Sequence, residues 1–339
     1  MHPTDSTRYA VRAEGLRKRY GKGKSEKPAL SGFDLAVPAG TVHGLLGPNG
    51  AGKTTAVRIL GTLLRADGGH ARVGGHDVAT EPRLVRRLVG FTGQYAAVDE
   101  ILSGRQNLEM FGRLFHLGRA TARRRAQELL EQFRLTEAAD KVVSGYSGGM
   151  RRRLDLAASL ILAPRVLFLD EPTTGLDPRA RNEVWDAVRD LAAAGTTVLL
   201  TTQYLDEADQ LADRITVISA APGEGGRTIA DDTPEALKNL IGGDQIEVVV
   251  AGPRQLAAAA RAVARVSGGR PHRDTEALRI SAPVADRVEA LTEVARVLRD
   301  EAVDVVDLGV RRPTLDEVFL RLTGVPTEQP EASQEVSAA

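Results

Sequence analysis

The sequence contains no cysteine among its 339 residues. That absence excludes a disulfide scaffold and any site built on a thiolate, and it is consistent with a reducing compartment. Charge of one sign is not in excess either, because 45 basic residues balance 45 acidic ones. Proteins that bind nucleic acid through its phosphates generally show a basic stripe or a high pI. We therefore expect no nucleic-acid partner.

Long hydrophobic runs are missing as well. The longest apolar region, residues 154–169, is interrupted by Asp155 and Arg165 and is too broken to span a bilayer. The first 15 residues lack the apolar core that a signal peptide needs. We therefore expect a protein that is soluble, or one that a partner holds on a membrane.

The chain is long enough, at 42% hydrophobic residues, for two domains with ordinary cores. The expected strands are residues 9–14, 30–37, 42–46, 71–73, 88–91, 166–170, 196–202 and 215–219. The expected helices are residues 54–64, 178–194 and 205–211, with helical spacing throughout 100–162. Strands that alternate with helices predict an α/β domain with a parallel sheet covered on both faces.

A second domain is expected after Gly242-Gly243. Its predicted order is strand 246–250, helix 253–263, two weak strands around Gly268-Gly269, helix 285–299 and strand 303–308. This order is typical of a split βαβ, ferredoxin-like α+β unit. A helix at 313–322 follows, and the Pro-, Glu- and Ser-rich tail is predicted to be disordered. The expected domains are residues 1–241, with a helical subdomain at about 95–165, then 242–324 and the tail 325–339.

The segment GPNGAGKTT matches G-x-x-x-x-G-K-[ST], a pattern that cradles phosphates. Its glycines let consecutive backbone N–H groups turn toward phosphate oxygens, and the helix that follows points its positive end at the anion. Lys53 supplies a charge for the outer phosphates, and the Thr54 hydroxyl reaches Mg²⁺. The predicted nucleotide-binding residues are Gly47, Pro48, Asn49, Gly50, Ala51, Gly52, Lys53, Thr54 and Thr55.

A second motif is a buried-type strand that ends in two acids, VLFLDE. Its carboxyl end delivers both carboxylates to the sheet edge where ligands bind in open α/β folds. We expect Asp170 in the Mg²⁺ shell and Glu171 as the general base that polarises the attacking water.

A third motif, YSGGM at residues 146–150, precedes an amphipathic helix, and alone Ser147 would be an ordinary N-cap. Together with the two preceding motifs it resembles the signature sequence of ATP-binding cassette (ABC) ATPases, with Tyr and Met where Leu and Gln are commoner. Gln94 resembles that family's Q-loop, and Gly175-Leu176-Asp177 its D-loop. Tyr20 resembles the aromatic residue that stacks on adenine.

The resemblance covers about residues 9–241 and implies a P-loop cassette with a mixed sheet core, an antiparallel β subdomain and an α-helical subdomain. It implies that ATP is sandwiched between two cassettes arranged head to tail. Ser147, Gly148 and Gly149 of one copy would then close over the phosphates held by the other, with Gln94 as a further contact of nucleotide and metal. Since the chain carries one cassette, we expect a homodimer that closes around ATP and Mg²⁺.

Gln203 stands where the family normally has His, at the end of a strand near the γ-phosphate. Both side chains can donate a hydrogen bond to a phosphate oxygen, but an amide cannot take up charge. We therefore expect Gln203 to position the γ-phosphate, and Lys53 and Glu171 to carry the rest of the catalysis.

Two further segments, TTQYLDEAD at residues 201–209 and TLDEVFLRLTG at residues 314–324, resemble the ATP-binding proteins of daunorubicin/doxorubicin-resistance-type exporters. This resemblance implies an ATPase at the cytoplasmic face of the cell membrane, coupled to a separately encoded integral membrane permease that contacts the drug. The second segment either docks on its own domain as an amphipathic helix or helps bind the permease or second cassette. The alternatives are an ATPase for a lipid or polysaccharide exporter, a soluble ABC protein of translation or DNA repair, and a sensory or drug-binding module.

Overall fold

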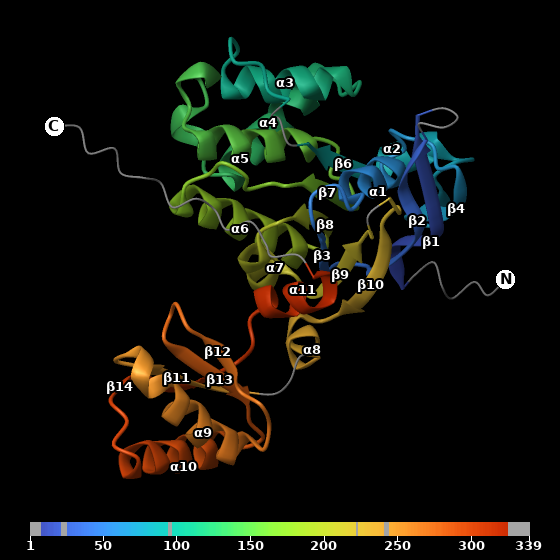
Figure 1. Cartoon of the computed structure of the whole chain (residues 1–339). Coiled ribbons are helices and arrows are strands. Elements are labelled where there is room, and N and C mark those ends of the chain that lie inside the picture. Colours follow the sequence, from blue (N-terminus) through green and yellow to red (C-terminus); the bar gives the residue numbers. More distant parts are fainter. Residues whose placement is uncertain (1–7, 22–25, 94–96, 222, 241–243, 325–339) are drawn as a thin grey trace. The chain divides into compact units, whose positions relative to one another are not determined.

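The computed structural model describes residues 8–21, 26–93, 97–221, 223–240 and 244–324. They form two compact units, which divide between Thr233 and Pro234 (Figure 1). Within this part of the chain, no helix is long and apolar enough to cross a membrane.

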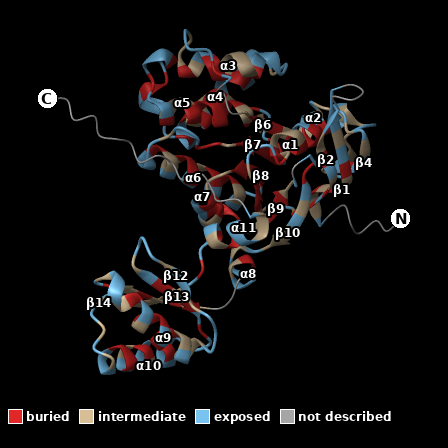
Figure 2. Ribbon diagram, in the orientation of Figure 1, coloured by how far each residue is buried: buried red, intermediate tan, exposed pale blue. Residues whose placement is uncertain are grey.

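The first unit is organised around a six-stranded mixed sheet. Its strand order is β10-β9-β3-β8-β7-β6, and only β10 runs antiparallel to its neighbour. The strands are β3 (Val42–Leu46), β6 (Val89–Thr92), β7 (Val166–Asp170), β8 (Thr197–Thr202), β9 (Arg214–Ser219) and β10 (Arg227–Asp232). Every residue of β3, β7 and β8 is buried (Figure 2). Their near-continuous apolar sequences are typical of strands covered on both faces.

An antiparallel sheet of order β2-β1-β4-β5 belongs to the same unit. Its strands are β1 (Tyr9–Tyr20), β2 (Lys27–Pro38), β4 (Gly68–Val73) and β5 (His76–Asp77). One core joins this sheet to helix α1 (Lys53–Leu60) and to Val166 and Phe168 of β7. The alternate β7 residues, Leu167 and Leu169, face a second core. The period of two in a strand thus assigns the two faces of β7 to two different cores.

The helices of the first unit cover the central sheet and form a separate helical region. They are α1 (Lys53–Leu60), α2 (Pro82–Leu88), α3 (Gly104–Leu114), α4 (Arg119–Gln132), α5 (Gly148–Ser159), α6 (Pro178–Ala193) and α7 (Leu205–Leu211), with 3₁₀ turns η2 (Thr136–Ala138) and η3 (Val143–Gly145). Side chains cap several of them; Ser103, for example, forms a reciprocal capping box with Gln106 at the start of α3. The mixed sheet, antiparallel sheet and helical region confirm the predicted α/β architecture.

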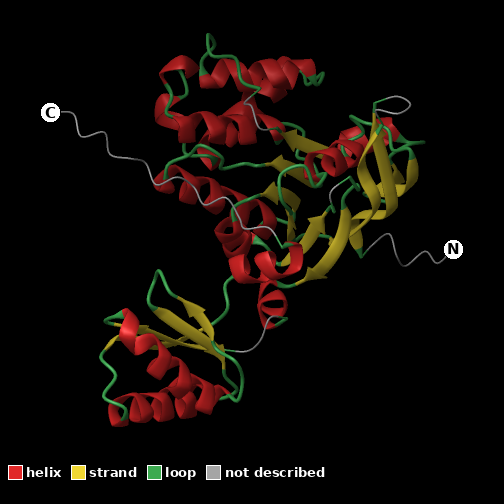
Figure 3. Ribbon diagram, in the orientation of Figure 1, coloured by secondary structure: helices red, strands yellow, loops and turns green. Residues whose placement is uncertain are grey.

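The second unit is an antiparallel sheet with two helices packed on one face (Figure 3). Its strands are β11 (Gln245–Val250), β12 (His272–Asp274), β13 (Arg279–Pro283) and β14 (Val305–Arg311), in the order β12-β13-β11-β14. The helices are α9 (Leu256–Ser267), which η4 (Pro253–Gln255) precedes, and α10 (Arg287–Asp300). Helices α8 (Pro234–Asn239) and α11 (Leu315–Thr323) flank them in the sequence. This βαββαβ order confirms the ferredoxin-like prediction.

Some predicted elements differ from the observed ones. Gly268 does not lie between two strands: it ends α9 with a left-handed φ of 64°, and the next strand begins only at His272. Helix α2 and strand β10 were not expected. Strand β10 lies at the edge of its sheet and its sequence, RTIADD, is polar and partly exposed, so it lacks the apolar run by which the other strands were recognised.

Candidate nucleotide-binding site

Three strands of the central sheet end side by side at the candidate site. In the parallel ladders, Leu46 at the end of β3 pairs with Thr202 of β8, and Asp170 at the end of β7 pairs with Thr201. The residues that follow β3, β7 and β8 therefore emerge at one edge of the sheet. The structure thus brings together three motifs that are far apart in the sequence.

The loop after β3 requires glycine at two positions for different reasons. A Cβ on Gly47 would lie 2.5 Å from the carbonyl oxygen of Ile218, so the backbone passes too close for any side chain. Gly52 has a left-handed φ of 99° just before α1 begins at Lys53. The loop consequently ends at a helix N-terminus, whose free N–H groups favour an anion.

Lys53 folds back over this loop. Its ammonium donates hydrogen bonds to the carbonyl oxygens of Gly47 at 2.6 Å and Pro48 at 3.3 Å, and the residue is buried. The charge therefore lies directly against the segment whose backbone is predicted to cradle phosphates.

Two hard oxygen donors meet beside the loop. The Thr54 hydroxyl lies 3.4 Å from Oδ1 of Asp170, which is almost fully buried. Among the described residues there is no group of three or more His, Cys, Asp or Glu side chains that could hold a metal ion by themselves. One carboxylate and one hydroxyl fit the way Mg²⁺ is usually bound, with few protein ligands and the remaining positions left to phosphate and water.

Thr201, to which the sequence assigned no role, organises the end of β7. Its hydroxyl donates to Oδ1 of Asp170 at 2.6 Å and accepts from the backbone N–H of Glu171 at 3.2 Å. A polar pair such as Thr201-Thr202 at the end of an otherwise apolar strand was the signal that could have revealed it.

Glu171 has a backbone conformation that is rare for a residue with a side chain. Its φ is 51°, and its N–H also bonds to the carbonyl oxygen of Thr201 at 3.1 Å. The carboxylate is partly exposed and accepts a hydrogen bond from Thr174 at 3.4 Å. Such strain costs about 1–3 kcal/mol and persists where the surrounding structure imposes it, commonly at functional sites.

Gln203 is the first residue after β8 and is partly buried. Its neighbour Thr202 pairs with Leu46, so Gln203 lies level with Gly47 at the start of the phosphate loop. The next turn is fixed by the Thr202 hydroxyl, which accepts from the N–H of Tyr204 at 2.9 Å. The amide is thus carried by a rigid strand end beside the loop.

Tyr20, at the end of β1, lies next to the same loop. Its hydroxyl is 3.5 Å from the Thr55 hydroxyl, the residue is 44% exposed, and the Lys18 ammonium lies 6.0 Å from the ring centroid. An exposed ring at this place is available to a planar ligand. Gln94, the other residue expected to reach the nucleotide from outside the loop, lies outside the described residues.

The signature segment lies elsewhere in the same unit, with α5 and α1 well apart in Figure 1. Ser147 caps α5, accepting from the N–H of Met150 at 3.2 Å, and Ser147 and Gly148 are exposed. Gly149 is buried. It lies so close to α6 that an added Cβ would be 2.7 Å from the Cβ of Ala180. Within one chain the segment is thus an exposed helix N-terminus that does not complete the phosphate site.

Behind the site, Glu207 is a fully buried carboxyl on α7. It accepts hydrogen bonds from Thr173 at 2.9 Å and from the indole of Trp185 at 3.1 Å. Burial raises its pKa, because the low-dielectric interior disfavours the charged form. Glu207 thereby joins α7, which follows Gln203, to the turn that follows Glu171 and to α6.

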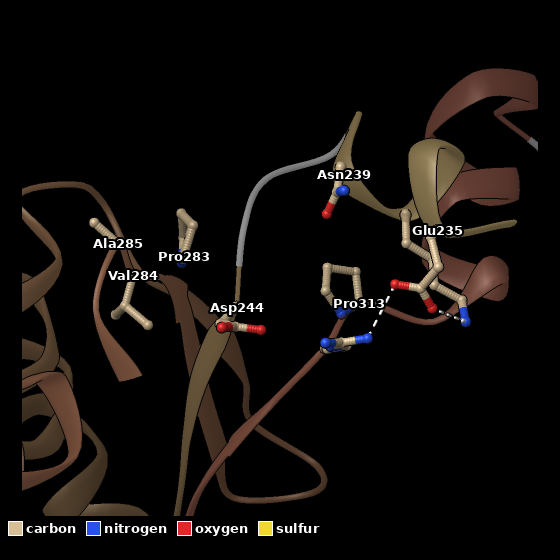
Figure 4. Close-up of a pocket in the computed structure, with 9 residues that line it drawn as sticks. Glu235, Asn239, Asp244, Pro283, Val284, Ala285 and Pro313 are labelled. Atoms are coloured by element: carbon tan, nitrogen blue, oxygen red, sulfur yellow. Dashed lines mark hydrogen bonds and ion pairs between the residues drawn. The ribbon is translucent and has the colours of Figure 1, made fainter. Parts of the chain in front are cut away.

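The second unit contains a separate polar pocket of about 560 Å³ (Figure 4). It is lined by Glu235, Lys238, Asn239, Asp244, Pro283, Val284, Ala285, Arg312 and Pro313. Its charged side chains are paired: Arg312 lies 3.0 Å from Glu235, Lys238 lies 3.8 Å from the same carboxylate, and Asp244 pairs with Arg287. None of the predicted nucleotide or metal residues lies there.

Comparison with known proteins gives consistent relatives. A family described as ABC transporter matches residues 30–174. The chain is 69% identical over 326 residues to the daunorubicin resistance ATP-binding protein DrrA2 of Streptomyces coeruleorubidus, which covers 96% of this chain and 98% of that protein. It is 50% identical over 339 residues to the daunorubicin/doxorubicin resistance ATP-binding protein DrrA of Streptomyces peucetius, over 99% of each chain. It is 40% identical to the Nod factor export ATP-binding protein I of Ralstonia nicotianae, over 92% of each chain.

Solved structures agree on the fold. The cbiO1 protein of Clostridium perfringens, part of an ABC transporter complex, has a TM-score of 0.61 and 24% identity, and the match covers 68% of this chain and 90% of that one. A dimeric ATP-binding cassette bound to ADP and phosphate has a TM-score of 0.58 and 24% identity, covering 66% of this chain and 98% of that one. These likenesses bear on the fold alone.

Proposed function

This chain belongs to the daunorubicin/doxorubicin-resistance ATP-binding proteins of the ABC transporter family, and on that premise we propose that it hydrolyses ATP to drive efflux of an anthracycline-like drug. The observation that carries the proposal is the meeting of Lys53, Thr54, Asp170 and Glu171 at one edge of the central sheet. Its relatives of highest identity above are named for daunorubicin resistance.

The proposed nucleotide site consists of the loop 47–55, with Lys53 against the outer phosphates and the exposed ring of Tyr20 against the base. Thr54 and Asp170, with Gln94, would hold Mg²⁺, which when bound neutralises charge on the phosphates. The hydrogen bonds of Lys53 to loop carbonyls and of Thr201 to Asp170 hold both charged groups ready before ligand arrives. Such preorganisation avoids reorganisation during the reaction.

For hydrolysis we assign Glu171 as the base that takes a proton from the attacking water. Its positive φ and its anchored N–H fix the direction of the side chain, and the carboxylate remains accessible. Gln203 donates a hydrogen bond to the γ-phosphate and holds it in line, and its amide takes no proton.

The working form proposed is a head-to-tail homodimer. The exposed N-terminus of α5, with Ser147 and Gly148, offers free N–H groups but stands apart from the phosphate loop of its own chain. A second copy can bring that helix end to the γ-phosphate, where it would be an anion site. ATP would then hold two copies together, and its hydrolysis would release them.

The proposed partner is a separately encoded membrane permease, which would hold this chain at the cytoplasmic face of the membrane and contact the drug. Export of a lipid-like or polysaccharide-like molecule is the second candidate, because a Nod factor export protein is 40% identical. The higher identity of 69% to a daunorubicin-resistance protein favours the drug.

The test is efflux from cells that carry this chain and its separately encoded permease. Wild type is expected to lower accumulated anthracycline and to leave a fluorescent lipid probe unaffected, and Glu171→Gln to abolish efflux and to leave only a slow residual ATP turnover. Export of the lipid probe alone would reverse the order of the two candidates. Full turnover by Glu171→Gln would refute the assigned base.

A further inference from the structure

A buried ion pair on the signature helix has no part in the assignments above. Arg152 and Asp155 lie one turn apart on α5, 7% and 4% exposed, with Nη1 of Arg152 3.3 Å from Oδ2 of Asp155. Arg152 is the middle residue of the run Arg151-Arg152-Arg153, of a kind that usually lies on a solvated face. Burying a charged pair costs several kcal/mol unless further hydrogen bonds offset the loss of water.

The further bonds of Arg152 reach the segment that carries Glu171. Its Nε donates to the carbonyl oxygen of Pro172 at 2.7 Å, and Nη2 lies 3.5 Å from the carbonyl oxygen of Glu171 itself. These carbonyls follow the last residue of β7, where the sheet no longer supplies donors. The guanidinium therefore continues the hydrogen bonding of the backbone past the strand end.

The same pair also forms hydrogen bonds to the backbone after the neighbouring strand, β6. Nη1 of Arg152 donates to the carbonyl oxygen of Gly93, directly after β6, at 2.8 Å. Asp155 Oδ1 accepts from the N–H of Ala97 at 2.7 Å. One buried pair thus fastens α5 to the backbone that follows β6 and to the backbone that follows β7.

We propose that Arg152, held by Asp155, is a positioning residue for ATP hydrolysis: it fixes the backbone of Glu171 to the helix that begins at Ser147. This inference rests on the proposed role of Glu171 as the base. Engagement of Ser147 by a nucleotide then sets the direction of the Glu171 carboxylate through a rigid connection. Arg152 is buried and acts on the base through the 171–172 backbone.

Arginine suits this task because its planar fork presents five donors in fixed directions, whereas lysine is a single flexible point charge. Arg152→Lys keeps the charge opposite Asp155, but its donors all sit on one nitrogen and cannot reproduce a fork that reaches Pro172 through Nε and Gly93 and Asp155 through Nη1. A misplacement of the base by about 1 Å costs on the order of 10²-fold in rate. We expect Arg152→Lys to lose about 10- to 100-fold in kcat, with the KM for ATP changed by less than about 2-fold.

The matched control is Arg151→Lys, one residue away on the same helix. Arg151 pairs with Glu100 at 2.9 Å with its side chain 34% exposed, so lysine can replace it there. Full-length variants, assembled with the permease in membrane vesicles, are assayed for kcat, KM and melting temperature. Should Arg152→Lys not fold, the double variant Arg152→Met with Asp155→Leu replaces it, because neither buried charge is then left unpaired.

The decisive measurement repeats the substitution in a Glu171→Gln background with single-turnover kinetics. If Arg152 acts through Glu171, the second substitution adds less than about a 2-fold further loss, because the two effects are not additive. An equal loss in both backgrounds, a full kcat for Arg152→Lys, or a KM that rises in step with the loss of kcat would each overturn the proposal. Full activity of Glu171→Gln alone would overturn the assigned base along with it, and an inactive wild type would refute the proposed function itself.

Discussion

The two units of this chain treat charged side chains differently. Every buried acidic, basic or histidine side chain of the described residues belongs to the first unit: His43, Lys53, Arg152, Asp155, Asp170 and Glu207. The second unit has several ion pairs, but the side chains of Arg287 and Arg296, for example, are 45% and 59% exposed. Buried charge is costly and exposed pairs are worth little. The difference indicates that the buried ionisable groups of the first unit are retained for specific roles in the structure or the site. The exposed charges of the second unit serve solubility and local order.

The largest expected effect comes from breaking a buried pair. Asp155→Ala leaves the Arg152 guanidinium without its counter-charge and the Ala97 N–H without its acceptor. Breaking such a pair costs about 3–5 kcal/mol, mostly because one charge stays buried and uncompensated. Urea unfolding monitored by circular dichroism measures this loss.

Glu100→Ala is the matched control. It removes the exposed partner of Arg151, which lies on the same helix as Arg152. An exposed pair contributes about 0–1 kcal/mol, so this variant should unfold close to wild type. Equal losses in the two variants would show that burial does not govern the value of these charges.

The next effect is an acid destabilisation centred on His43 in β3. Burial lowers the pKa of His43 from 6.5 to about 4, against the opposing charge of Asp231. The ring Nε2 lies 2.7 Å from the Thr216 hydroxyl, which in turn donates to Asp231. Above pH 6.5 the His43 imidazole is neutral in both the folded and the unfolded chain, so His43 does not reduce the free energy of unfolding there.

As the pH falls from 6.5 toward 4, the unfolded chain binds a proton that the folded chain refuses, so stability is lost. The expected loss is about 3 kcal/mol across this window, at about 1.4 kcal/mol per pKa unit. Urea melts of wild type and His43→Gln at several pH values between 7 and 4 measure it. The slope between these limits should be shallower in His43→Gln, and an identical slope would place the proton uptake elsewhere.

The charged residues of the first unit differ in how well the sequence predicts them. The loop 47–55 and the acids Asp170 and Glu171 are found from the sequence because each motif is contiguous and lies between recognisable elements. Arg152 is not, since its burial depends on the carbonyls of Gly93 and Pro172, 59 and 20 residues away along the chain. An acid three residues on, within an apolar helix, was the only local sign.

In the second unit, the sequence predicts the elements and their order but not what fixes the last helix. Glu317 of α11 closes a capping box with Thr314 and binds Arg311 through both carboxylate oxygens, at 2.6 and 3.0 Å. Arg311 in turn pairs with Glu247 of β11. This network supports docking of the TLDEVFL segment on its own unit. Contact with the permease or second cassette through this segment stays a prediction.

A smaller effect is accordingly expected for Glu317→Gln. The amide can still cap Thr314, but it loses the charge opposite Arg311, whose side chain is 33% exposed. We expect about 1 kcal/mol, which corresponds to about fivefold faster hydrogen exchange across residues 315–323. Exchange in α5 should not change, and added salt should narrow the difference because the pair is partly solvated.

The smallest effect is expected for the pair Glu293–Arg296 on α10. The two side chains lie 2.6 Å apart and are 44% and 59% exposed, so water and salt compete with their attraction. Glu293→Ala should leave the melting temperature unchanged within error, at both low and high salt. We expect this although the N···O distance of Glu293–Arg296 is shorter than the 3.3 Å of Arg152–Asp155. A fall like that of Asp155→Ala would mean that distance rather than burial decides the worth of an ion pair here. No fall would leave burial as the property that separates the charges of the two units.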